Sequence, residues 1–179
     1  MKIGRELGVT ASELRVLARA GLLHDVGKLG IPDAILHKQG PLDESEWTVM
    51  KTHPEIGLTI LGRAGHFKRE LLAVLYHHER IDGSGYPHGL VADAIPLEAR
   101  IVAVADTYDV LTSDRPYRKA RSVSDALCVV RNEAGSHLDH KVVNALLVTL
   151  GAEHPPPGEV IAHNGHGAVL EEAGGLVGT

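Results

Sequence analysis

Six side chains that can bind a metal ion are spread over four segments of this 179-residue chain, and each segment has the pattern of a helix or a helix end. They are histidines and aspartates: His24, Asp25, His53, His77, His78 and Asp106. Imidazole nitrogens and carboxylate oxygens, without a thiolate, suit Fe, Mn or Zn in a hydrolytic site. A fold that uses all six must bring four helical segments together around one point.

Each of these residues also has an ordinary structural explanation. His53 alone is more often a helix-end or surface histidine, and His77 and His78 could both be solvated, because adjacent residues of a helix point about 100° apart. Asp106 follows the apolar run 101–105, which predicts a helix that is buried on all sides. A buried aspartate needs a cation or several hydrogen bonds, so Asp106 is either a metal ligand or the partner of a nearby loop. Taken together, the six residues favour a metal site.

The other histidines show no such grouping, and the simplest interpretation places them on the surface or in loops. They are His37, His66, His88, His137, His140, His154, His163 and His166.

The strongest local signals in the sequence are helix starts. Thr10 as the N-cap and Glu13 three residues later form a capping box, and an apolar stripe of helical period follows. Residues 42–47 repeat this signature and predict a second helix. We expect Pro54 to end that second helix just after His53 and to begin a third.

The remaining segments also predict helices, over 68–79, 97–112, 122–134 and 139–150. Residues 82–96 contain several glycines and prolines without periodicity, so they are expected to form a loop. The fold class is therefore predicted to be all-α. We expect one domain over 1–150 and a Gly- and Pro-rich tail over 151–179, in which 159–161 and 168–170 could pair as a weak β-hairpin.

The composition excludes several kinds of protein. A net charge of -5 gives no basic surface for DNA, so an anionic substrate would need local groups of Lys and Arg. The single Cys128 excludes an internal disulfide and fits a reducing compartment. No apolar run approaches the roughly 18 residues of a membrane span, and the N-terminus lacks the apolar region of a signal peptide. We therefore expect a cytoplasmic protein.

Two motifs give the chain a family resemblance. Residues 24–28 (His-Asp-Val-Gly-Lys) resemble the signature of the HD phosphohydrolase superfamily. Residues 77–87, HHERIDGSGYP, resemble the HD-GYP family, the bacterial phosphodiesterases that hydrolyse cyclic di-GMP. The other matching runs are Gly-Ile-Pro at 30–32, His-Pro-Glu-Ile-Gly at 53–57, Ala-Asp-Thr-Tyr-Asp at 105–109 and Arg-Pro-Tyr-Arg at 115–118. The resemblance covers about residues 1–150.

The resemblance implies an HD-domain helical bundle that holds two, or in some members three, iron or manganese ions. Asp25 would bridge two of the ions. The other ligands of one ion would be His53, His77 and His78, and those of the second would be His24 and Asp106. The ions would activate water for attack on the phosphorus and Lys28 would contact a phosphate oxygen, so Asp25 and Lys28 are the expected catalytic residues.

The resemblance also implies a substrate pocket lined by Lys28, Tyr86, Arg115 and Arg118. A tyrosine ring can stack on guanine, and an arginine can form paired hydrogen bonds with phosphate oxygens. The alternative is that Tyr86 only anchors its loop and that Arg115 and Arg118 are only helix-end cations.

The chain departs from the family pattern at its N-terminus. Family members begin with a longer helix that carries a further His ligand, whereas residues 1–8 resemble only the last turns of that helix and no His precedes His24. We therefore expect a truncated first helix, a second ion that lacks one ligand, and weak hydrolysis by this chain.

The predicted function is a metal-dependent phosphodiesterase that converts cyclic di-GMP to pGpG and GMP in bacterial second-messenger signalling. The alternative is a catalytically impaired module that binds cyclic di-GMP or a signalling protein, and a third possibility is an HD enzyme for another cyclic dinucleotide. The resemblance further implies contact with a diguanylate cyclase through the loop Gly85-Tyr86-Pro87. A truncated first helix would expose an apolar face, so a homodimer formed through that end is a further hypothesis.

Overall fold

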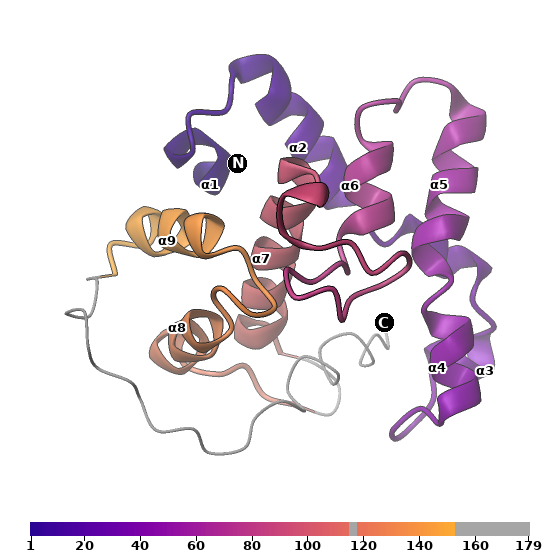
Figure 1. Ribbon diagram of the computed structural model, residues 1–179. Coiled ribbons are helices and arrows are strands. Elements are labelled where there is room, and N and C mark those ends of the chain that lie inside the picture. Colours follow the sequence, from indigo (N-terminus) through magenta and orange to yellow (C-terminus); the bar gives the residue numbers. More distant parts are fainter. Residues whose placement is uncertain (115–117, 153–179) are drawn as a thin grey trace.

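The computed structural model describes residues 1–114 and 118–152 (Figure 1). Within these residues the regular elements are helices: α1 (Lys2–Glu6), α2 (Ala11–Leu23), η1 (Val26–Gly30), α3 (Asp33–Leu36), α4 (Glu44–Met50), α5 (His53–Ala64), α6 (Leu71–Tyr76), η2 (Ala92–Ala94), α7 (Leu97–Thr112), α8 (Val123–Asn132) and α9 (His140–Thr149). The elements η1 and η2 are short 3-10 helices. The prediction of an all-α fold is confirmed, and the hairpin predicted in the tail lies outside the described residues.

Both predicted capping boxes are present, because their hydrogen bonds are local to the sequence. At the start of α2 the Thr10 hydroxyl accepts from the backbone N–H of Glu13, and the Glu13 carboxylate accepts from the backbone N–H of Thr10 at 3.0 Å. At the start of α4, Asp43 accepts from the N–H groups of Ser45 and Glu46, each at 2.9 Å. These contacts satisfy N–H groups that have no partner inside the helix, so they fix where each helix begins.

Two helix boundaries differ from the prediction. Helix α4 ends at Met50, and His53 is the first residue of α5, so Pro54 does not end α4 as expected. The Thr52 hydroxyl donates to the carbonyl of Val49 at 2.7 Å, which supports a turn before His53. The helix predicted over 68–79 is shortened to α6, which ends at Tyr76. At the end of α6 the ring of His77 donates to the carbonyl of Val74 at 2.7 Å, a contact that hydrophobic periodicity does not describe.

Helix α7 is the central element of the bundle (Figure 1). It packs against α2 and α6 as well as against α8 and α9, while α1 lies on α9. The main core cluster is built from residues of α1, α2, α7, α8 and α9, and Val104, Val130 and Val142 in it are fully buried. This packing places Asp106 of α7 near the C-terminal ends of α2 and α6, where the candidate ligands lie.

The predicted burial of α7 on all sides is wrong. Val104 and Leu111 are fully buried, but Ala105 and Asp109 are exposed, and the Asp106 side chain is 27% exposed. One stripe of the helix therefore faces away from the core, and Ala105 made that stripe look apolar in the sequence. Asp106 consequently does not carry the full cost of a buried charge.

Gly27 allows η1 to lie directly against α5. A Cβ atom at this position would lie 1.8 Å from the carbonyl oxygen of His53 and 2.6 Å from the nitrogen of Gly57. No side chain fits there, because both neighbours are backbone atoms of a packed helix. The close approach brings Asp25, directly before η1, beside His53, at the start of α5.

None of the helices in the described part of the chain has the length and apolar character of a membrane span.

We predict that Gly27→Ala destabilises the chain by about 3 kcal/mol, the upper end of typical overpacking costs, because the new methyl group meets backbone atoms. Gly21→Ala is the matched control. Gly21 lies inside α2 with nothing within 4 Å of an added Cβ atom, so that change should stabilise by about 0.5–1 kcal/mol. Urea unfolding of both variants measures the two effects, and equal stability of Gly27→Ala and the unaltered chain would contradict the packing described.

Candidate metal centre

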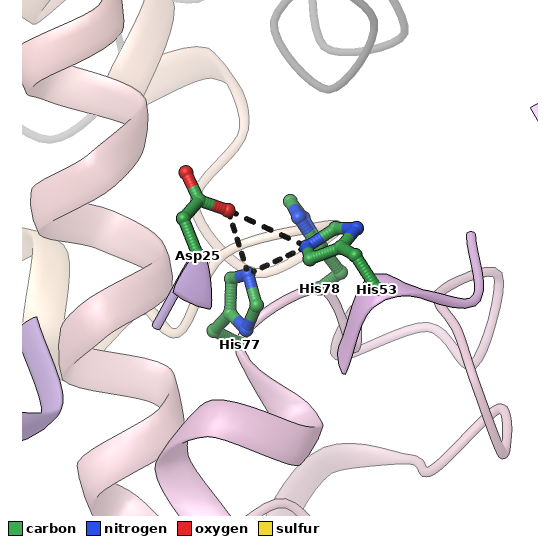
Figure 2. A group of neighbouring side chains, drawn as sticks. All are labelled: Asp25, His53, His77 and His78. Atoms are coloured by element: carbon green, nitrogen blue, oxygen red, sulfur yellow. Dashed lines mark hydrogen bonds and ion pairs between the residues drawn. The ribbon is translucent and has the colours of Figure 1, made fainter. Parts of the chain in front are cut away.

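Four of the six predicted ligands converge from three segments of the chain (Figure 2). Asp25 precedes η1, His53 opens α5, and His77 and His78 follow α6. Each residue offers one ligand atom, and the four atoms lie within 4.8 Å of one another. Within residues 1–114 and 118–152, no other group of three or more potential ligands comes this close.

Backbone carbonyls orient three of the histidine rings. Each ring donates from Nδ1 to the carbonyl three residues earlier: His24 to Gly21 (2.8 Å), His53 to Met50 (2.9 Å) and His77 to Val74 (2.7 Å). A carbonyl oxygen can only accept, so in the neutral ring the proton is on Nδ1 and the lone pair is on Nε2. This arrangement behind a ligand is typical of metal-binding histidines.

The free Nε2 atoms point at one another. Nε2 of His53 and Nε2 of His77 are 3.4 Å apart, and the buried Nε2 of His78 has no hydrogen-bond partner among the described residues. Oδ1 of Asp25 faces the same place, 3.4 Å from His53 Nε2 and 3.8 Å from His77 Nε2 (Figure 2). Lone pairs that face one another in a buried site repel unless a cation lies between them, so the arrangement fits a metal ion.

The second oxygen of Asp25 faces a different set of groups. Oδ2 lies 3.3 Å from Nε2 of His24 and 2.8 Å from Nζ of Lys28. Nε2 of His24 is in turn 3.6 Å from Oδ1 of Asp106. The carboxylate of Asp25 therefore stands between two groups of candidate ligands, with one oxygen turned towards each.

The protonation states differ on the two sides of Asp25. Burial lowers the pKa of His53 to about 4 and that of His77 to about 3, and burial lowers the pKa of His78 well below its ordinary value. These three imidazoles are therefore neutral at physiological pH, which is the form that binds metals. On the other side, burial disfavours a charge on His24, but hydrogen bonds to Asp106 and Asp25 outweigh it and raise the pKa of His24 to about 10.

Asp25 itself is strongly held in its ionised form. Burial acts against the charge, but the hydrogen bond from His24 and the ammonium of Lys28 keep the pKa of the Asp25 carboxyl well below its usual range. In the metal-free chain the proton on His24 thus balances the two carboxylates beside it. A cation between Asp25 and Asp106 would take over that role and release the proton.

The loop after His78 is held against the candidate metal centre by its own residues. The buried carboxylate of Glu79 accepts from the N–H groups of His88 at 2.7 Å and Leu90 at 2.9 Å. Gly85 lies so close to the backbone that a Cβ atom would be 2.3 Å from the nitrogen of Arg80. The loop therefore has one tight path, and sequence analysis missed Glu79 although it directly follows the two histidines.

The same loop stacks Tyr86 on a candidate ligand. The rings of Tyr86 and His78 are 4.7 Å apart between centroids, at an interplanar angle of 24°. The hydroxyl of Tyr86 is buried without a hydrogen-bond partner among the described residues, and burial raises the pKa of this phenol. The Nζ atom of Lys51 lies over the Tyr86 ring, 5.7 Å from its centroid. Lys51 is a second residue that the sequence analysis did not single out.

The structure describes one of the two predicted arginines. Arg115 lies outside the described residues. The guanidinium of Arg118 donates from Nη2 to the carbonyl of Val110 in the last turns of α7. This contact favours the interpretation of Arg118 as a helix-end cation, and its role in substrate binding stays a prediction.

One of the other histidines has a structural role. His137, in the turn between α8 and α9, accepts the backbone N–H of Ile81 on its carbonyl, and its ring lies between the carboxylates of Glu133 and Asp82. Its Nε2 atom is 3.5 Å from Oδ2 of Asp82. His137 thus ties the loop that carries Tyr86 to the α8–α9 turn.

Residues 1–142 match the family model described as "HD domain". The chain belongs to the HD domain family. It is 49% identical over 147 residues to the cyclic di-GMP phosphodiesterase response regulator RpfG of Xanthomonas campestris, a match that covers 81% of this chain and 39% of that protein. It is 39% identical over 174 residues to the cyclic di-GMP phosphodiesterase PA4108 of Pseudomonas aeruginosa, covering 96% of this chain and 42% of the relative.

A third relative carries a different name. The chain is 40% identical over 144 residues to the 3'3'-cGAMP-specific phosphodiesterase 3 of Vibrio cholerae, covering 80% of this chain and 31% of that protein. The chain thus spans well under half the length of these relatives. Among solved structures, Bd1817, an HDG"Y"P protein from Bdellovibrio bacteriovorus, matches with a TM-score of 0.68 and 21% identity, over 84% of this chain and 48% of that one. These matches confirm the HD-GYP resemblance and the helical fold.

We predict that the double variant His77→Ala/His78→Ala loses the metal ion held with His53 and Asp25, because two of its four ligands are removed. Elemental analysis after loading with iron or manganese measures the loss. The matched control is His37→Ala/His66→Ala, which removes two exposed histidines and should keep the full metal content. Undiminished metal in a folded His77→Ala/His78→Ala variant would contradict the assignment.

The metal-free chain should be most stable near pH 6.5. His53 and His77 have lowered pKa values, so between about pH 4 and 6.5 the unfolded chain binds more protons, and stability falls as the pH is lowered. His24 has a raised pKa of about 10, so the stability it contributes is present below pH 6.5 and is lost as the pH rises towards 10. Urea unfolding across this range checks both directions. In the variant His24→Gln, stability should no longer fall as the pH rises from 6.5 towards 10. A fall as large as in the unaltered chain would contradict the role of His24.

Proposed function

We propose that this chain is a metal-dependent phosphodiesterase domain that hydrolyses cyclic di-GMP to pGpG and GMP. The observation that carries the proposal is the position of Asp25, whose two carboxylate oxygens face two separate sets of candidate ligands. A carboxylate in this position is suited to bridge two cations. The names of two relatives, RpfG and PA4108, support cyclic di-GMP as the substrate.

The ligand set favours two divalent ions, with iron or manganese preferred and a third ion left open. His53, His77, His78 and Oδ1 of Asp25 would hold the first ion. His24, Asp106 and Oδ2 of Asp25 would hold the second. Such ions, when bound, supply activated water and offset the charge of the phosphate. The chain's own contribution is to keep three imidazoles neutral and the shared carboxylate ionised, as their pKa values require.

Lys28 is the proposed link between the metal centre and the substrate. Its ammonium is 2.8 Å from Oδ2 of Asp25 and its side chain is 11% exposed, so it is directed towards the shared carboxylate. There it can donate to a phosphate oxygen while it keeps Asp25 ionised. Tyr86, Arg115 and Arg118 remain the proposed substrate-binding residues, and the ring of Tyr86 lies beside a candidate ligand.

A second candidate function is a module that binds a cyclic dinucleotide without turning it over. The observation that favours it is the weaker second ligand set, which consists of His24, Asp106 and the shared Asp25. Within residues 1–114 and 118–152, no further ligand joins these three to make a group as close as the first. An ion on that side would bind less tightly, and a two-ion reaction would be slow.

Another cyclic dinucleotide as substrate is a further alternative, supported by the name of the Vibrio cholerae relative. Contact with a diguanylate cyclase through residues 85–87, a homodimer and a cytoplasmic location stay predictions.

The test of the proposed function is hydrolysis of cyclic di-GMP by the chain loaded with iron or manganese, followed by separation of the products. We predict slow, chelator-sensitive release of pGpG. Asp25→Asn should lower the rate by at least about 100-fold, because the loss of a group that only supports a metal ligand already costs up to about 100-fold. Asp109→Asn, an exposed carboxylate of the same helix as Asp106, is the control and should retain the rate. Turnover that survives both chelation and Asp25→Asn would reject the proposal, whereas tight binding without turnover would favour the binding module.

A further inference from the structure

Lys51 is a cation at the edge of the candidate metal centre. It is the C-cap residue of α4, two positions before His53, and its side chain is exposed. Among the described residues it forms no ion pair, and its one recorded side-chain contact is with the face of the Tyr86 ring, 5.7 Å from the centroid to Nζ. An exposed ammonium over a tyrosine is held only weakly. The charge of Lys51 is therefore available to a ligand.

The other lysine of the site does not have this freedom. Nζ of Lys28 is bound to the Asp25 carboxylate at 2.8 Å, so much of its charge is already offset inside the centre. The centre also contains the negative charge of Asp106, and the chain as a whole has a net charge of -5. The proposed ions and Lys28 would offset the charge of the reacting phosphate, but the second phosphate of a cyclic dinucleotide lies on the other side of its ring and would need a further cation. Lys51 lies beside the centre, because the Tyr86 ring that it covers is stacked on His78.

We propose that Lys51 binds a phosphate of the cyclic dinucleotide at the rim of the centre, an inference that rests on the proposed function. The flexible stem of a lysine lets the ammonium leave the Tyr86 ring and reach a phosphate oxygen without breaking an ion pair. The reacting phosphate belongs at the metal ions and Lys28, so Lys51 serves the second phosphate of the same molecule. Lys51 is in this account a substrate-binding residue with no part in activating water.

The competing explanation is that Lys51 only keeps the Tyr86 ring in place. Two variants separate the explanations: Lys51→Met keeps an apolar stem that can pack on the ring but has no charge, and Lys51→Arg keeps the charge. If the charge binds phosphate, the dissociation constant for cyclic di-GMP should rise about tenfold in Lys51→Met and stay within about threefold in Lys51→Arg. If Lys51 only packs on Tyr86, the loss in Lys51→Met should be small.

The measurement is calorimetric titration of the metal-loaded chain with cyclic di-GMP at low and at high salt, in which the fast heat of binding is separated from the slow hydrolysis proposed above. Lys141→Ala is the control for overall charge, because Lys141 is exposed on α9, away from α4 (Figure 1). The loss in Lys51→Met should shrink as salt rises, since an exposed charge is screened. Equal dissociation constants for Lys51→Met and the unaltered chain, or an equal loss in Lys141→Ala, would overturn the inference and leave the proposed function intact. No binding by the unaltered chain would reject the proposed function and this inference together.

Discussion

The structure of the site depends on the carboxylate of Asp25, which must face two sets of ligands at once. One oxygen faces His53 and His77, and the other faces His24 and Lys28. This is possible because η1 begins directly after Asp25 and lies against the first turn of α5, a contact that only glycine at position 27 allows. The packing of backbone on backbone is thus the condition for a shared carboxylate, and the orientation of the histidines by their own carbonyls completes it.

Electrostatics and geometry both fit a cation on each side of Asp25. Three buried imidazoles are kept neutral by burial, and their free nitrogens gather on one side of Asp25. On the other side a protonated His24 stands between two carboxylates. A cation on each side satisfies the lone pairs on the first and replaces the proton on the second. The two sides are unequal, because the first has four candidate ligands and the second has fewer. How tightly the second side binds its ion therefore decides between a working phosphodiesterase and a binding module.

Much of the fold and the residue types of the site could be predicted from sequence, because the signals are local. The side chains of Thr10 and Asp43 accept hydrogen bonds from N–H groups in the first turn of the helix that follows, so the starts of α2 and α4 can be predicted from a few adjacent residues. The end of α6 and the exposure of Asp106 could not be predicted in this way, since they depend on what packs against a helix and from which side. The contacts of Glu79 and Lys51 depend on the path of the loop that carries Tyr86, which periodicity does not describe.

The central claim is that Asp25 is shared by two metal ions, and anomalous X-ray scattering from crystals of the chain loaded with manganese tests it most directly. The account predicts one strong peak among His53, His77, His78 and Oδ1 of Asp25, and a second, weaker peak among His24, Asp106 and Oδ2 of Asp25. Crystals of Asp25→Asn should lose the second peak and weaken the first. A single peak that makes no contact with Asp25, or two peaks that persist unchanged in Asp25→Asn, would contradict the claim.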